Sequence, residues 1–332
     1  WGYVGPLAIP LLLFNANIKK FWRESGRIRI IFLLSPIGTL VGVFVAHALL
    51  KNYIPELYKM SAIITGSYIG GGVNFAAMAE AFGAGEAWIS ALTVADNLLM
   101  ALYFFVLLAI PAMNFFLKKF THPHIDAVNA MVDTSEGETL AKQYWGRKEI
   151  SLKDIAFSIA LGLIIVWIST ELAAVLKSII PTGNFILDLA NGLLGNKYML
   201  ITTFTMLLAT YAHRFMSSIN GAQEIGTFLI YIFLVVIGVP ASIPVIINQA
   251  PLLLVFTAII VAINMLISLV LGKLFKFDLE EILLASNANI GGPTTAAAMA
   301  IAKGWNKLIG PIILAGVFGY IIGNYLGIFM GN

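Results

Sequence analysis

The sequence contains no cysteine and few charged residues, and both absences limit what the protein can be. Without cysteine there can be no disulfide and no thiolate metal site. Only 11% of the 332 residues are charged, against about 25% in a typical soluble domain. So few charges could not cover a soluble globule of this size, which excludes a soluble enzyme, a disordered chain and a nucleic-acid-binding protein. The 59% hydrophobic content instead indicates an integral membrane protein with several crossings.

The charges that are present fall in short clusters between long apolar runs. Six lie in 19–29, twelve in 118–154 and five in 273–281, whereas 215–272 contains only Glu224. Since a membrane-crossing helix needs about 20 apolar residues, the sequence predicts an all-α polytopic membrane protein with about 10 transmembrane helices. We expect them near 3–18, 29–50, 58–82, 87–117, 154–179, 198–213, 221–239, 250–274, 279–304 and 306–330, with 183–195 as a further short or re-entrant segment.

A polar stretch divides the chain into two halves. Residues 118–153 hold six basic and five acidic residues, and we interpret them as a solvated linker. The domains expected are a first transmembrane repeat at 1–117, the linker at 118–153, connecting transmembrane segments at 154–220 and a second transmembrane repeat at 221–332. The chain starts at Trp1 inside an apolar run without a recognisable signal peptide, so we expect the native protein to begin earlier.

An internal repeat supports this division. The segments IGGGVNFAAMAEAFG at 69–83 and IGGPTTAAAMAIAKG at 290–304 align without gaps at an offset of 221, with nine identities in fifteen positions. Chance similarity between two segments rich in Ala and Gly is the alternative, but the pattern of spans repeats at the same offset. Duplicated halves are frequent in secondary transporters.

Basic residues predict how the two halves are oriented. The loop 19–29 carries five Lys and Arg residues, which places it in the cytoplasm by the positive-inside rule. The equivalent loop of the second half, near 240–250, has no charge, and the basic residues Lys273 and Lys276 follow one connection later. This favours an inverted repeat, with the number of crossings between 117 and 221 left open.

Each repeat has a glycine-rich break in the middle of an apolar span. The break residues are Gly70, Gly71 and Gly72 in the first repeat and Gly291, Gly292 and Pro293 in the second. Gly and Pro disfavour continuous helix, and the freed backbone groups need a cavity, an ion or another backbone as partner. The alternative is that the glycines only allow close helix packing.

Neutral oxygen ligands near half-helix ends suit a hard cation such as sodium. We therefore expect two crossed broken helices to frame an ion and substrate site, with a sodium ion near Asp96 and Asn289. The residues expected to line it are Ser67, Asn74, Asp96, Asn97, Ser286, Asn287, Asn289, Thr294 and Thr295.

Three acids inside the predicted spans have a functional and a structural interpretation. Asp96 is a candidate to ligate sodium or carry a proton, since carboxylates at such depth are expensive, but it could also hydrogen-bond a neighbouring backbone. Glu80 either faces the cavity or lies near the membrane surface beside Glu86. Glu224, at the start of 221–239, is either a helix-dipole partner or a site residue.

Two further features carry no chemistry in this interpretation. A row of glycines lies on one face of the last span, which indicates close helix packing: Gly316, Gly319, Gly323, Gly327 and Gly331. No hydrolase, nucleotide-binding or zinc motif is present, so we expect neither an enzyme nor a cofactor beyond a bound sodium ion.

Several segments resemble one family. TGSYIGGGVNFAAMAEAFG at 65–83, ADN at 95–97 and ASNANIGGPTTAAAMAIAKGW at 285–305 are similar to the signatures of domain-of-unknown-function family 819, the YjcL-like membrane proteins. That family is similar to the bile acid–sodium symporter and sodium/proton antiporter superfamily. The resemblance implies a core domain with crossed broken helices, a separate panel or dimerisation domain, and alternating access. It also makes Asp96-Asn97 look like a reversed form of the antiporters' Asn-Asp pair.

The expected function is therefore secondary active transport of a small organic solute, coupled to sodium or protons, in the cell (inner) membrane. The alternatives are a cation/proton antiporter that uses Asp96 and a non-transporting membrane scaffold or sensor. The expected partners are the lipid bilayer, a sodium ion or proton, a small solute and a second copy of the chain.

Overall fold

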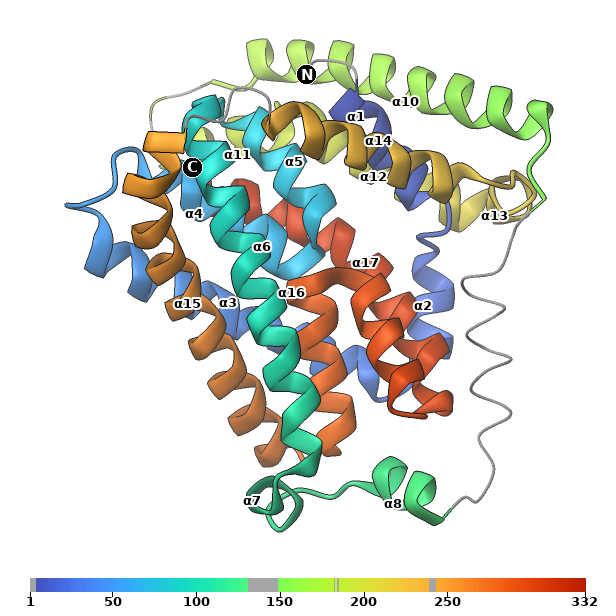
Figure 1. Cartoon of the computed structure of the whole chain (residues 1–332). Coiled ribbons are helices and arrows are strands. Elements are labelled where there is room, and N and C mark those ends of the chain that lie inside the picture. The colour runs from blue at the N-terminus through green and yellow to red at the C-terminus, as the bar shows by residue number, and fades with distance from the viewer. Residues whose placement is uncertain (1–3, 131–148, 182, 184, 239–242) are drawn as a thin grey trace.

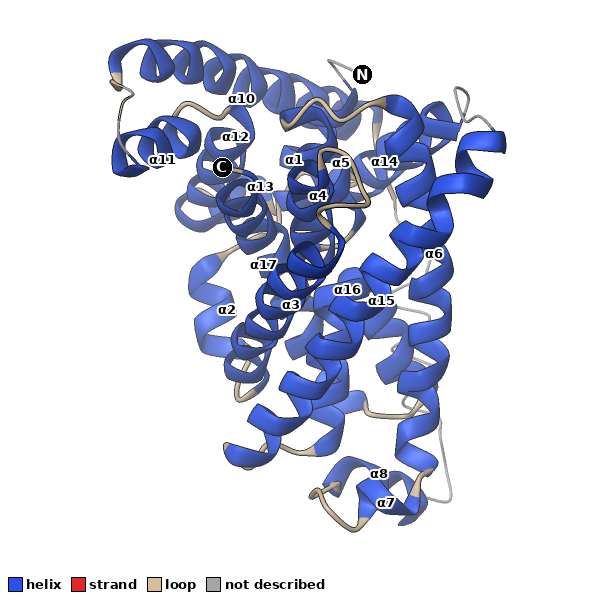
Figure 2. Cartoon of the chain, turned by 90° about the vertical axis from the view of Figure 1, so that its left-hand side faces the viewer, coloured by secondary structure: helices blue, strands red, loops and turns tan. Residues whose placement is uncertain are grey.

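The computed structural model describes residues 4–130, 149–181, 183, 185–238 and 243–332. All regular structure within these ranges is helical (Figures 1 and 2). Most of the predicted linker, 131–148, lies outside the described residues. The helices are α1 Val4–Leu13, α2 Ile18–Glu24, α3 Ile28–Leu50, α4 Leu57–Gly70, α5 Gly72–Ala81, α6 Glu86–Ala109, η1 Ile110–Ala112, α7 Asn114–Leu117, α8 Pro123–Ala130, α10 Leu152–Ile179, α11 Phe185–Leu194, α12 Lys197–Tyr211, α13 His213–Met216, α14 Ala222–Gly238, α15 Ile243–Leu274, α16 Leu279–Ala302 and α17 Asn306–Gly331.

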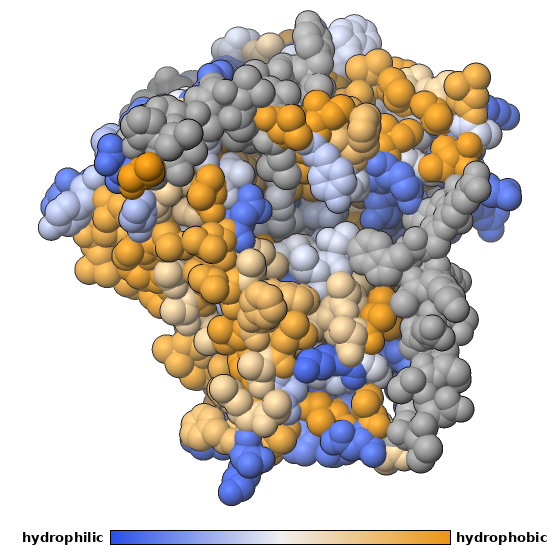
Figure 3. Space-filling model, in the orientation of Figure 1, coloured by the Kyte–Doolittle hydropathy of each residue, from blue (hydrophilic) through white to orange (hydrophobic). Residues whose placement is uncertain are grey.

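Five of the described helices are long and apolar enough to cross a membrane. They are α3, α6 with its 3-10 extension, α10, the part of α15 from Ala250 to Leu274, and α17. Large apolar side chains such as Phe105 on α6 and Trp167 on α10 are 68% and 65% exposed, as lipid contact requires. Apolar residues accordingly cover much of the face seen in Figure 3. The ten or so crossings expected from the sequence are not all present as long helices, and two of the predicted spans, 58–82 and 279–304, are reversed at the glycine breaks.

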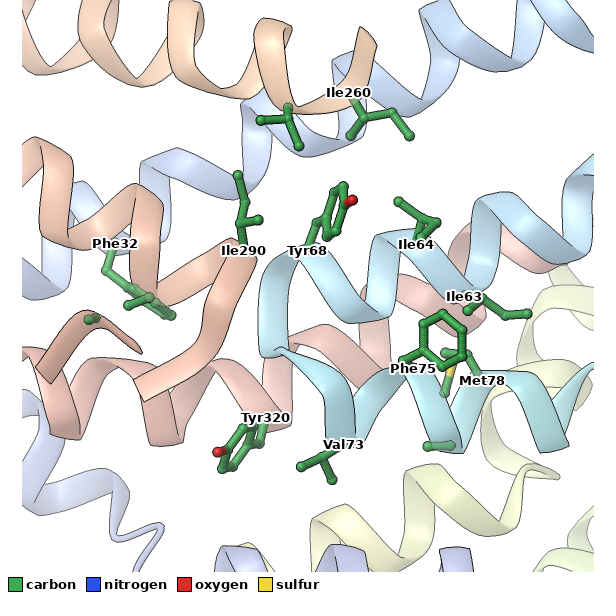
Figure 4. Close-up of a cluster of buried hydrophobic side chains, with 14 of the residues drawn as sticks. Phe32, Ile63, Ile64, Tyr68, Val73, Phe75, Met78, Ile260, Ile290 and Tyr320 are labelled. Carbon is green, nitrogen blue, oxygen red and sulfur yellow. The ribbon is translucent and has the colours of Figure 1, made fainter. Parts of the chain in front are cut away.

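The segments expected as broken crossing helices are helical hairpins. In the first, α4 runs to Gly70 and α5 returns beside it, so that Met78 on α5 lies against Gly66 on α4 (Figure 4). At the open end of this hairpin, the Lys59 ammonium is 3.4 Å from the carbonyl oxygen of Gly83. In a straight helix, residues 24 positions apart would be about 36 Å apart. We call residues 57–81 hairpin 1.

The second glycine break reverses α16 in the same way. The Asn287 amide nitrogen before the break is 3.3 Å from the Thr295 carbonyl oxygen and 3.4 Å from the Met299 sulfur after it. Both breaks are placed correctly by the sequence, but the expectation that the chain continues across the membrane is wrong. We call residues 279–302 hairpin 2.

Helices α3 and α15 pack against each other in opposite directions. Gly38 lies against Asn264, and Gly42, one turn later, lies against Ile260, one turn earlier. Because Cβ atoms at these glycines would come within 3 Å of the facing backbone, the two helices approach as closely as small residues allow. Each helix of this antiparallel pair is followed in the chain by a hairpin: hairpin 1 follows α3, and hairpin 2 follows α15.

The open ends of the hairpins lie at opposite ends of the molecule. Hairpin 2 opens toward α8, where the Glu280 carboxylate accepts a 2.7 Å hydrogen bond from the Ile125 backbone N–H (Figure 1, lower end). Hairpin 1 opens toward the end of α17, where Phe82 lies against Gly331. The hairpins therefore enter the fold from opposite ends and meet by their tips.

The glycine row of α17 packs on hairpin 1, as its spacing predicts. Gly319 lies against the Ile69 carbonyl oxygen, Gly323 against the Gly66 carbonyl oxygen and Gly327 against Met78. A second group of helices, α1, α10, α12 and α14, packs together beside this core. The chain thus forms a hairpin core and an adjoining helix group.

Candidate functional site

The site is built where the two hairpin tips touch. Gly71 has φ 85° and ψ −174°, and Gly292 has φ 82° and ψ 179°, a backbone conformation open essentially to glycine alone. A Cβ atom at Gly71 would lie 3.3 Å from the Gly292 Cα. The two residues are separated by the repeat offset of 221, so matched positions of the repeat form the contact.

A cavity of about 700 Å³ opens between the tips and the adjoining helix group. Hairpin residues form one wall, and side chains of α14 and α1 form the other. The described residues that line it are Leu12, Gly71, Gly72, Val73, Ile150, Gln223, Glu224, Thr227, Phe228, Ile230, Tyr231, Gly291, Gly292, Thr294, Thr295, Ala298 and Tyr320. The size and the mixed lining suit a small organic solute.

Glu224 is the one Asp, Glu, Lys, Arg or His among the described lining residues. It lies in the first turn of α14, beside Gln223 and one turn from Thr227. Glu224 is thus both an acid in the first turn of a helix and a residue of the cavity lining. The opposite wall holds the first turns of α5 and of the second arm of hairpin 2, where backbone N–H groups lack partners within the helix.

Asp96 lies behind the tips and does not line the cavity. The Ser67 hydroxyl donates a 3.4 Å hydrogen bond to its carboxylate, and the Tyr68 hydroxyl is close by without hydrogen-bond geometry. One turn further along α6, Met100 packs against Gly291 at the tip of hairpin 2. Asp96 is therefore partly buried beside the first arm of hairpin 1 and close to both tips.

Two buried amide oxygens in the hairpins have no hydrogen-bond partner among the described residues: Asn74 Oδ1 and Asn289 Oδ1. The Asn74 amide nitrogen donates to the Tyr320 carbonyl oxygen at 2.7 Å and to Asn324 Oδ1 at 2.8 Å. Asn289 donates to the backbone carbonyl oxygens of Phe32 and Ala285. Unpartnered buried oxygens are costly, and a bound cation would satisfy them.

The remaining predicted residues lie in four different places. Thr294 and Thr295 line the cavity, and Thr295 also donates to Asn287 Oδ1 at 2.9 Å. Ser286 is buried and bonds the Tyr103 hydroxyl at 2.5 Å. Asn97, the next residue after Asp96 on α6, is exposed. Glu80 lies away from the cavity, 2.9 Å from the Lys197 ammonium.

A buried polar network behind the hairpins was not anticipated from the sequence. Asn264 on α15 donates to the Ser35 carbonyl oxygen and to Thr39 Oγ1, both at 2.9 Å. It accepts from Ser286 of hairpin 2 at 2.8 Å, and Thr39 donates to the Tyr68 carbonyl oxygen of hairpin 1. The network joins both hairpins to the α3–α15 pair.

Comparison with known proteins agrees with this membrane architecture. A family model described as "Protein of unknown function (DUF819)" matches residues 1–332. The chain belongs to this family. The "Uncharacterized membrane protein YjcL" of Bacillus subtilis strain 168 is 51% identical over 332 residues, covering 100% of this chain and 82% of the relative. These matches confirm the family expected from the sequence motifs and identify an integral membrane protein, and they name no activity.

Proposed function

We propose that this protein is a secondary active transporter that moves a small organic solute by alternating access at the hairpin tips. The main observation behind the proposal is the contact of Gly71 with Gly292 at the wall of a cavity with a mixed polar and apolar lining. Irregular backbone at membrane depth is tolerated where it is buried in protein or lines a cavity, and half-helix ends there bind substrates and coupling ions.

The two repeats are related by inversion in this proposal. Antiparallel packing of α3 and α15, and hairpins that enter from opposite ends, are what a two-fold axis in the membrane plane would produce. The shorter helices α1, α12 and α14 then enter or cross the membrane and complete the set of spans. The relation to bile acid–sodium symporters and sodium/proton antiporters is part of this proposal. Their crossed broken helices correspond here to hairpins that meet by their tips.

The distribution of basic residues supports a cytoplasmic position for the open end of hairpin 2. Arg27, in the predicted cytoplasmic loop 19–29, lies 3.5 Å from Glu281 and 3.8 Å from Asp278 at this end. Lys273 and Lys276 of the second repeat lie in the adjacent connection. Both basic loops thus meet at one end, as the positive-inside rule requires of a cytoplasmic face in the cell (inner) membrane.

Coupling in this proposal depends on sodium or a proton near Asp96. The carboxylate and Ser67 Oγ supply oxygen ligands beside hairpin 1, and Asn74 Oδ1 and Asn289 Oδ1 are further buried oxygens of the hairpins. A cation/proton antiporter that uses Asp96 is the second candidate, because the acid lies outside the solute cavity.

Exposed apolar residues of α10, Trp167 among them, suit contact with lipid or with a second copy of the chain.

The melting temperature of the purified protein in detergent tests the proposal. Sodium is titrated against potassium and choline at fixed ionic strength and two pH values. A ligand that binds only the folded state stabilises it by about 2.7 kcal/mol at a hundredfold excess over Kd. We expect sodium alone to raise the melting temperature, Asp96→Asn to abolish the rise, and Glu171→Gln, at an exposed site on α10, to retain it.

Each alternative predicts a different result in this experiment. The melting temperature of a proton-coupled transporter or antiporter depends on pH, and Asp96→Asn removes that dependence. The antiporter also exchanges cations in liposomes without any organic solute. A scaffold or sensor shows the same melting temperature in sodium and choline at both pH values, with or without Asp96→Asn. That last result would contradict the transporter proposal.

A further inference from the structure

Helix α2 presents basic and aromatic side chains at one edge of the molecule (Figures 1 and 2). The Lys19 ammonium lies over the Tyr211 ring, 4.5 Å from its centroid. The Arg29 guanidinium lies 5.5 Å from the centroid of the exposed Trp22 ring. Basic groups and aromatic rings are therefore interleaved on one surface, which we call the α2 surface: Lys19, Lys20, Trp22, Arg23, Arg29 and Tyr211.

The rest of the fold holds this surface in place. Phe21, on the inner side of α2, is buried, and its ring stacks on that of Phe318 of α17 with the centroids 4.2 Å apart. The Ile18 backbone N–H donates to Thr210 Oγ1 at 3.2 Å, and the Asn17 side chain caps the first turn. Since the amino end of α2 is capped, its outward side chains are what the helix offers to a ligand.

The α2 surface carries an excess of positive charge. Residues 18–29 contain one acid, Glu24, which lies 3.8 Å from the Lys20 ammonium with both side chains more than half exposed. Such an exposed pair contributes little. Lys19, Arg23 and Arg29 make no salt bridge within the part of the chain that the structure describes. The surface is therefore complementary to an anionic partner.

The surface lies at the boundary of the membrane in the topology proposed above. Helix α2 connects α1 to the start of α3, and the following Arg27 contacts Glu281 at the open end of hairpin 2, the proposed cytoplasmic face. Trp22 is 48% exposed and Ile30, in the first turn of α3, is 47% exposed. The positive-inside rule explains basic residues in this loop, but it does not require an anchored helix with aromatic rings among them.

We propose that the α2 surface binds the headgroups of anionic phospholipids in the cytoplasmic leaflet. The Lys19 and Arg23 side chains, one turn apart on α2, pair with lipid phosphate groups, and so does Arg29. The rings of Trp22 and Tyr211 lie beside these cations at the boundary with the acyl chains, where aromatic residues are enriched. Each Lys or Arg near an anionic lipid surface increases affinity about fivefold.

The α2 surface is linked to the hairpin core through α17. Phe318, on which Phe21 stacks, is followed by Gly319, which lies against the Ile69 carbonyl oxygen of hairpin 1. A headgroup bound to α2 therefore stabilises contacts of a helix that packs close to the hairpin tip. Anionic lipid should accordingly raise the melting temperature of the whole chain.

Thermal unfolding of the purified full chain in detergent micelles tests the proposal. Phosphatidylglycerol is titrated against phosphatidylcholine with the same acyl chains, and inorganic phosphate serves as a probe without a lipid. Because stabilisation depends on the ratio of ligand concentration to Kd, each titration gives an apparent affinity. We expect phosphatidylglycerol alone to raise the melting temperature, with a weaker apparent affinity at high salt, which screens exposed charges.

Two variants with opposite effects assign the binding to α2. Lys19→Gln with Arg23→Gln should weaken the apparent affinity for phosphatidylglycerol roughly 25-fold, about fivefold for each charge. Glu24→Gln removes the acid and should strengthen that affinity about fivefold. A loss of folding could not produce the second result.

The matched control is Lys118→Gln with Lys119→Gln, which removes the same charge beside α7, away from α2 in Figures 1 and 2. It should change the affinity little, since the attraction falls off within a Debye length. Equal stabilisation by phosphatidylcholine or phosphate, unchanged affinity in the α2 double variant, or an equal loss in the control would overturn the proposal. None of these outcomes bears on the cavity, so the transport proposal is tested separately.

Discussion

At the scale of single residues, the two tip glycines determine the fold of the site. Gly71 and Gly292 adopt positive φ with ψ near 180°, where a side chain would clash with its own backbone. The neighbouring glycines differ, since Gly72 has ordinary φ and open space. Gly71 and Gly292 therefore reverse the chain, whereas Gly72 only leaves open space beside the tip.

Substitution of either tip glycine by alanine should destabilise the protein by about 1–3 kcal/mol, the usual cost of a residue forced into this conformation. Gly71→Ala also brings its methyl group to 3.3 Å from the Gly292 Cα. Denaturant or thermal unfolding in detergent measures the effect. Gly310→Ala, in an open position of α17, should be neutral or slightly stabilising, and equal losses in all three variants would contradict the account.

The sequence alone located the breaks but could not distinguish a crossing helix from a hairpin. Glycine at Gly71 and Gly292 indicates interrupted helix, whereas the direction of the next arm depends on contacts such as Met78 with Gly66. Thr294 and Thr295, which the sequence predicted to line an ion and substrate site, lie in the cavity wall. Gln223 and Thr227 also line the cavity but were not predicted to do so, because nothing in the local sequence shows that α14 faces the hairpin tips.

At the scale of helices, arm length explains why the hairpins do not span the membrane. The arms α4 and α5 contain 14 and 10 residues, and at 1.5 Å per residue they extend about 21 Å and 15 Å. A bilayer core is about 30 Å thick, so each arm reaches only part of the way across. The tip contact is therefore compatible with the proposal that two hairpins enter from opposite sides and meet within the membrane.

Cysteine labelling in membrane vesicles tests the hairpin arrangement, because the 332-residue sequence has no cysteine. A membrane-impermeant maleimide should label Tyr53→Cys and Glu86→Cys, which flank hairpin 1, from the same side. It should label Phe275→Cys and Lys307→Cys, which flank hairpin 2, from the other side. All four positions are exposed. If the two residues that flank one hairpin were labelled from opposite sides, each break would lie in a crossing helix and the account would be wrong.

The contact between α17 and hairpin 1 gives a separate prediction. A Cβ atom at Gly323 would lie 2.8 Å from the Gly66 carbonyl oxygen and 2.9 Å from the Gly70 backbone nitrogen. Because backbone atoms cannot move aside cheaply, Gly323→Ala should cost about 1–3 kcal/mol of stability. The unfolding free energy relative to Gly310→Ala, on the same helix, measures it. A neutral Gly323→Ala would show that the two helices are farther apart than described.

At the scale of the whole molecule, the cavity separates two groups of helices. The hairpins, α3 and α15 are joined by the network around Asn264, and α6 is joined to it through Tyr103 and Ser286. The facing wall of the cavity comes from α1 and α14. This division suits a hairpin core that moves as one body against the adjoining group, so that the cavity opens to each side in turn.

The most direct test of this account is the accessibility of Thr227→Cys, a conservative replacement in the cavity wall of a cysteine-free chain. Impermeant maleimide is applied to right-side-out and to inside-out vesicles, with Tyr53→Cys and Lys307→Cys as markers of the two sides. Alternating access predicts that Thr227→Cys is labelled from both sides, and that sodium with a bound solute shifts the ratio of the two rates. Labelling from one side only, with or without sodium and solute, would contradict it.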